Sequence, residues 1–153
     1  MYTLDLIIHS WLRWLLSLSL IVNLYFIYSG YFNNKKFTNF NKFFSHFTVG
    51  LVHTQFILGT YLYFTSENMG TFFADVKGSM AISDLRFFAV EHTFLMLVAV
   101  ILVTIGSFKS KRKKDDKSKF KTQLVFYTIA FIIMLIAIPW EFSPFAQRPF
   151  FRF

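Results

Sequence analysis

Cysteine is absent from the 153 residues. This absence excludes disulfides, thiolate metal sites, thiol catalysis and haem attached through cysteine, so only imidazole, carboxylate or methionine ligands remain. Proline and glycine are scarce, at three and six residues, and no Gly/Pro/Ser-rich linker or Gly-rich phosphate loop is present. Residues 1–153 are therefore expected to form one domain.

Acidic residues are also few: eight Asp and Glu stand against 16 Lys and Arg, for a net charge of +8. The basic residues lie in short loops between apolar segments rather than along one soluble face, so no nucleic-acid partner is expected. No Ser/His/carboxylate arrangement indicates hydrolytic catalysis. The sequence therefore does not favour a stand-alone enzyme.

Apolar residues dominate, with 55% hydrophobic and 22% aromatic residues and a mean hydropathy of +0.48. That composition predicts an integral membrane protein in direct contact with the lipid bilayer. Four apolar segments approach or exceed the ~20 residues that a helix needs to cross hydrocarbon; they are residues 4–30, 42–64, 84–107 and 120–138. We predict an all-α, up-down four-helix bundle with an aromatic surface tail, 139–153. The first segment is expected to be a retained span rather than a signal peptide.

The distribution of basic residues predicts the orientation. The loops 31–42 and 109–121 contain three and eight Lys and Arg, respectively. Because basic loops stay in the cytoplasm, both termini are expected outside. The chain is expected to cross the membrane several times.

Ionisable residues inside these segments are candidate functional groups, since each costs roughly 2.5 kcal/mol or more in a bilayer unless it is paired, ligated or hydrated. With ~1.5 Å rise per residue, His9 and His92 lie at similar depths, about 8 and 9 Å from the outer boundary, and His53 lies about 16 Å deep. His46 is expected near the cytoplasmic surface. In an up-down bundle the first and third helices can lie diagonally, so His9 and His92 are the preferred haem ligands. His53 is a third ligand or a proton-handling group.

Three charged residues accompany the histidines: Arg13, Arg86 and Glu91. Arg13 or Arg86 could neutralise haem propionates, and Arg86 could instead anchor the third helix at the interface. Glu91 could orient an imidazole or carry a proton, or it could pair with Arg13 to hold helices together.

One stripe of the second segment is predicted to face the interior of the bundle. His46, Gly50, His53 and Ile57 recur at helical spacing on one side of that helix.

Three other functions are compatible with these residues. His9, His53 and His92 with Glu91 could bind Zn or Cu, although no compact metal motif is present. Histidine and Glu91 could exchange protons with a quinone packed against aromatic rings. The polar residues could also join the helices of an accessory membrane subunit that has no cofactor and contacts other subunits.

The sequence also resembles small bacterial four-helix membrane proteins that are labelled cytochrome-b-like. The stretches that carry the resemblance cover all four segments: His9-Ser-Trp-Leu-Arg-Trp14, His53-Thr-Gln-Phe-Ile-Leu-Gly59, Tyr61-Leu-Tyr-Phe64, Arg86-Phe-Phe-Ala-Val-Glu-His92, Thr104-Ile-Gly106 and Ile138-Pro-Trp140. The resemblance implies that His9, His53 and His92 form the polar centre and that the cofactor is haem b. It also implies that the protein lies in the cytoplasmic (inner) membrane of a bacterium. The expected function is therefore electron transfer through haem b, by this chain alone or as part of a larger membrane complex.

Overall fold

A computed structural model describes the backbone of residues 2–151 and the side chains of residues 4–151, and this part of the chain is helical without strands. The predicted tail therefore ends two residues beyond the described part. The helices are α1 (Tyr2–Phe32), α2 (Asn39–Thr65), α3 (Glu67–Ala74), α4 (Val76–Ser79), α5 (Ser83–Arg86), the π-helix η1 (Phe87–His92), α6 (Thr93–Lys111) and α7 (Asp116–Ala137).

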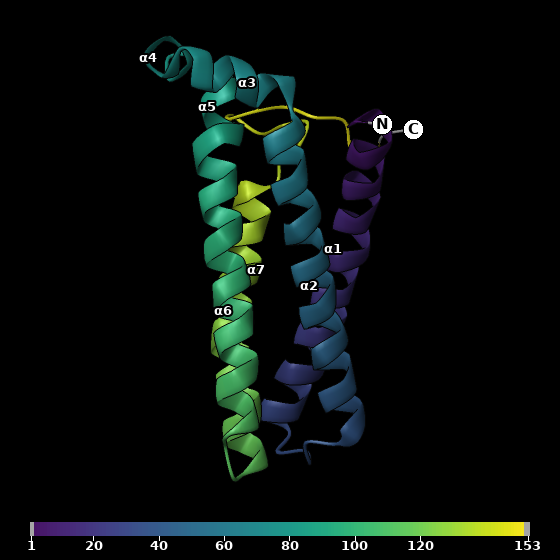
Figure 1. Ribbon diagram of the computed structural model, residues 1–153. Coiled ribbons are helices and arrows are strands. Elements are labelled where there is room, and N and C mark those ends of the chain that lie inside the picture. Colours follow the sequence, from purple (N-terminus) through teal and green to yellow (C-terminus); the bar gives the residue numbers. More distant parts are fainter. Residues whose placement is uncertain (1, 152–153) are drawn as a thin grey trace.

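The four predicted apolar segments each lie within a long helical stretch, and η1 joins α5 to α6 without a break. These stretches lie side by side, and the N- and C-terminal ends lie at the same end of the molecule (Figure 1). α2 packs against α1 and α6, and α7 packs against α6 and α1. Consequently α1 and α6 are diagonal to each other, the arrangement considered for the helices of His9 and His92.

Three stretches are long and apolar enough to cross a membrane: Leu4–Phe32, Ser83–Lys111 and Asp116–Ala137. The prediction of a helical protein with membrane-spanning segments is confirmed to that extent. α2 has 27 residues, which is also sufficient length, but it is not among the three. Its histidines, glutamine and several hydroxyl side chains explain the lower hydropathy.

The inward face of α2 differs from the prediction. Gly50, His53 and Ile57 are exposed, and Ile57 retains 69% of its accessible surface. The side chains of α2 that face the interior lie about one residue earlier in the sequence than predicted. They include the buried residues Ser45, Thr48, Val52 and Leu62. Both stripes have helical spacing, so periodicity alone could not choose between them. The chosen stripe buries small and hydroxyl side chains that fit between closely packed helices and leaves an isoleucine outside.

Hydroxyl and amide side chains join the helices in the half of the molecule that contains the basic loops. Thr48 Oγ1 lies 2.9 Å from Ser19 Oγ and accepts a hydrogen bond from Asn23 Nδ2 at 3.2 Å, which links α1 to α2. Ser45 Oγ lies 2.9 Å from Tyr127 Oη and accepts from Gln123 Nε2, also at 2.9 Å, which links α2 to α7. These hydroxyl and amide bonds therefore link α1 to α2 and α2 to α7 without His9 or His92.

Candidate functional site

A cavity of about 620 Å³ lies between the long helices in the half that contains the chain termini. α1, α2, η1, α6 and α7 all contribute to its wall, and the tail adds Arg148. Its lining is mainly apolar, with side chains such as Leu20, Met96, Phe131 and Met134. Both His9 and His92 line it, so the structure brings together the two residues preferred as a ligand pair.

His92 is held by the end of α7. Its Nδ1 lies 2.8 Å from the carbonyl oxygen of Ala137. A carbonyl oxygen only accepts, so Nδ1 carries the proton and the neutral imidazole has its lone pair on Nε2. This arrangement is typical of ligating histidines, whose second nitrogen donates to a carbonyl or carboxylate.

His9 is held differently, by Gln55 of α2. Gln55 Nε2 lies 3.0 Å from the carbonyl oxygen of His9 and 3.2 Å from its Nε2. The carbonyl fixes the orientation of the amide, because only the NH₂ group can donate to it, and the same NH₂ group therefore donates to the imidazole. The lone pair of His9 Nε2 is thus engaged, and Nδ1 carries the proton. Nδ1 and Gln55 Oε1 are buried without a hydrogen-bond partner among the described residues.

Gly59 makes room for the His9 ring. A Cβ atom at position 59 would lie 3.1 Å from Cε1 of His9, closer than ordinary van der Waals contact. Gln55 and Gly59 are four residues apart and therefore share one side of α2. Together they fix where the His9 ring lies.

The tail contributes Arg148 to the cavity lining and is bonded to α1. Arg13 Nη2 and Trp14 Nε1 both donate to the carbonyl oxygen of Phe150, at 2.7 and 2.8 Å. Trp14 also stacks on Phe151 with ring centroids 5.4 Å apart. The yellow tail crosses the same end in Figure 1. The tail is thus part of the site.

Arg148 belongs to the same wall and is fixed from two sides. Its Nη2 lies 2.6 Å from Oδ2 of Asp84, and its guanidinium lies 4.7 Å from the centre of the Phe88 ring. Together with Arg13, it places two cations around the outer part of the cavity.

Glu91 and Arg86 pair with each other, which differs from the roles predicted for them. Arg86 Nε donates to Glu91 Oε1 at 2.9 Å, whereas Arg13 donates to the tail. The imidazole of His92 is oriented by the Ala137 carbonyl rather than by Glu91. Neither Arg86 nor Glu91 is among the residues that line the cavity.

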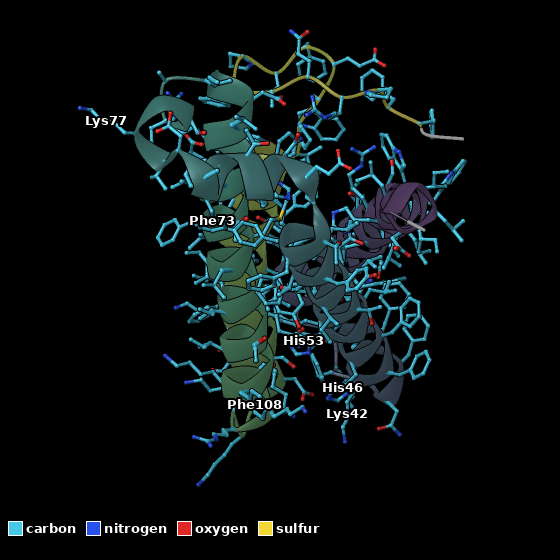
Figure 2. All side chains as sticks on the ribbon, turned by 45° about the horizontal axis from the view of Figure 1, so that its top comes forward. Lys42, His46, His53, Phe73, Lys77 and Phe108 are labelled. Carbon is cyan, nitrogen blue, oxygen red and sulfur yellow. The ribbon has the colours of Figure 1, made fainter. Side chains whose placement is uncertain are left out.

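His53 and His46 lie outside the cavity. His53 is exposed, and its Nε2 lies 2.9 Å from Oγ1 of Thr104 on α6. Because Thr104 donates its own proton to the Val100 carbonyl, His53 must donate to Thr104. Figure 2 labels His53 and His46 at successive positions along α2. Within the described part of the chain, no group of three His, Cys, Asp or Glu side chains is arranged to hold a metal ion.

Sequence reasoning did not select Gln55, Gly59, Arg148 or the backbone of Phe150. Gln55 and Gly59 had a detectable signal, because they are spaced at i and i+4 within a stretch that carried the family resemblance. Arg148 and Phe150 had no detectable sequence signal, because their contacts join positions more than 60 residues apart.

Comparisons with protein-family models, with curated proteins and with solved structures each gave no match.

Proposed function

We propose that this chain is a cytochrome-b-like protein that binds a b-type haem in the cavity and takes part in electron transfer, alone or within a larger complex. The proposal includes a four-helix transmembrane bundle with both termini outside the cytoplasmic membrane of a bacterium. The observation that carries it is the presence of His9 and His92, from diagonal helices, on the wall of one apolar cavity.

The residues fit a haem in three respects. The cavity volume of about 620 Å³ lies within the ~300–1,000 Å³ typical of cofactor and small-molecule sites. His92 presents the Nε2 lone pair of a neutral imidazole. Arg13 offers positive charge to the carboxylates of a haem edge, whereas Arg148 is already paired with Asp84 and Arg86 lies outside the lining.

A bound haem supplies reversible one-electron chemistry, whose potential depends on the axial ligands and on solvent exclusion. The chain has no cysteine, so the haem would be held without thioether bonds. His92 would hold the iron through Nε2, and the Ala137 carbonyl fixes its ring. The wall is mainly apolar, and the tail contributes Arg148 to it.

The test is the visible spectrum of the purified full-length chain. We expect haem absorption bands that shift when the protein is reduced, their loss in His92→Ala, and an unchanged spectrum in the control His46→Ala. His46 is a suitable control because it lies on α2 but outside the cavity lining. A folded wild-type chain that takes up no haem would contradict the proposal and favour an accessory subunit without cofactor.

A further inference from the structure

The two histidines of the cavity are held in chemically different ways. His92 donates from Nδ1 to a backbone carbonyl, which leaves Nε2 free of that bond. His9 has its Nε2 lone pair occupied by the amide of Gln55. A metal needs that lone pair, so as the side chains lie one imidazole is ready to ligate and the other is not.

We propose that Gln55 is a positioning residue that keeps His9 from ligating the haem, so that one coordination position stays free for a small neutral ligand such as carbon monoxide or dioxygen. This inference rests on the proposed haem binding. It replaces the expected His9–His92 ligand pair with ligation by His92 and a polar pair, His9 and Gln55, on the cavity wall.

Three features hold His9 in this state. Gln55 donates to two atoms of His9, one on the ring and one on the backbone, so the amide cannot turn without losing both bonds. Gly59 permits the ring to lie close to α2, because a Cβ atom at this position would lie 3.1 Å from Cε1 of His9. The remaining nitrogen, Nδ1, carries a proton and cannot ligate in this tautomer.

One free polar atom of this pair suits a small ligand beside it, because His9 Nδ1 can donate to dioxygen, whereas neither dioxygen nor carbon monoxide has a hydrogen to donate to Gln55 Oε1. His9 Nδ1 is a buried donor and Gln55 Oε1 a buried acceptor, and neither has a hydrogen-bond partner in the described part of the chain. Buried polar groups are rarely left in this way unless water, an ion or a ligand completes them.

The spectrum of the haem-loaded wild-type chain is the first test, and it needs no variant. We expect a high-spin ferric spectrum and rapid binding of carbon monoxide to the reduced form. A low-spin spectrum without carbon monoxide binding would overturn this inference and leave haem binding intact. A chain that binds no haem would overturn both.

The Gln55→Leu variant tests the role of the glutamine. Leucine cannot donate and cannot ligate iron, so His9 Nε2 is released and the spectrum should become low-spin, with loss of carbon monoxide binding. Adding His9→Ala to Gln55→Leu should restore the high-spin, carbon monoxide-binding state.

The matched control Thr54→Val should behave as the wild type, because Thr54 is exposed and its hydrogen bond runs to its own helix backbone. A haem-loaded Gln55→Leu chain that stays high-spin would exclude this role for Gln55. If Gln55→Leu does not fold, Gln55→Asn, whose shorter side chain withdraws the amide, takes its place with the same expected shift.

Discussion

The Nε atom of Arg86 lies 2.9 Å from Oε1 of Glu91, although the two residues are five positions apart. In an α-helix, side chains three or four residues apart face each other, and those five apart do not. The π-helix η1 changes this relationship because its hydrogen bonds run from i to i+5. The pair therefore depends on the same irregular turn that presents His92 to the cavity.

Replacing Glu91 by Gln should have a small effect. About a third of each side chain is exposed (36% and 34%), so we expect a loss of about 0–1 kcal/mol in the free energy of unfolding. The spectrum of the proposed haem should not change, because the Glu91 side chain bonds to Arg86 and is not among the residues that line the cavity. Glu67→Gln, which removes the same charge from an exposed site on α3, is the control for thermal unfolding in detergent. Loss of the proposed haem in Glu91→Gln would show that Glu91 does contribute to the site.

Replacing Gly50 by Ala should stabilise the protein, whereas replacing Gly59 by Ala should not. Alanine is favoured over glycine in a helix by roughly 0.5–1 kcal/mol, and nothing lies within 4 Å of a Cβ at position 50, so Gly50→Ala should stabilise the protein. At position 59 the new methyl group meets His9, which should offset that gain and displace the ring. Unfolding in increasing denaturing detergent would compare them. Equal stabilisation by both substitutions would argue against close packing at His9.

Thr48→Val should weaken the contact between α1 and α2. Thr48 is fully buried, and valine at this position cannot make the hydrogen bonds that Thr48 makes with Ser19 and Asn23. Interhelical hydrogen bonds in membranes contribute about 0.6 kcal/mol on average and up to about 1.7, so we expect a loss of about 1–2 kcal/mol. Thr54→Val is the control, and the same unfolding assay applies. If both variants lose equal stability, the buried cluster contributes nothing specific.

Trp14→Phe should loosen the tail while keeping an aromatic ring at that position. Phenylalanine lacks the Nε1–H group that donates to Phe150, a bond worth about 1 kcal/mol. Limited proteolysis should cleave the tail faster than in the wild type. Trp140→Phe removes a hydrogen bond to the Leu135 carbonyl rather than to Phe150. It should therefore increase the rate of tail cleavage less than Trp14→Phe does. Unchanged cleavage in Trp14→Phe would mean that Arg13 and ring packing suffice.

The proposed orientation can be tested with single cysteines, because the natural chain has none. Lys77 lies in α4 and Lys113 in the loop after α6, at opposite ends of the molecule (Figure 1). A membrane-impermeant maleimide added to intact cells should label Lys77→Cys and not Lys113→Cys. The reverse pattern would invert the proposed topology.

Composition and hydrophobic run length determined the helical membrane character of this protein, because a bilayer requires long apolar helices that satisfy their own backbone hydrogen bonds. They also located His9 and His92 at similar depth, since depth follows from counting residues along a helix. The sequence could not determine the rotation of α2, because two stripes one residue apart have the same spacing. Tertiary packing decided it, burying Thr48 and Val52 and leaving His53 outside.

The finer features of the site depended on contacts between distant segments. The pairing of Arg86 with Glu91 follows from a π-helix that no pattern in the sequence indicated. The tautomer of His92 is set by a carbonyl 45 residues away, and that of His9 by an amide 46 residues away. The sequence determined which residues could carry the chemistry. Tertiary structure alone decided which of their nitrogen atoms remain free, because each depends on a partner that folding brings close.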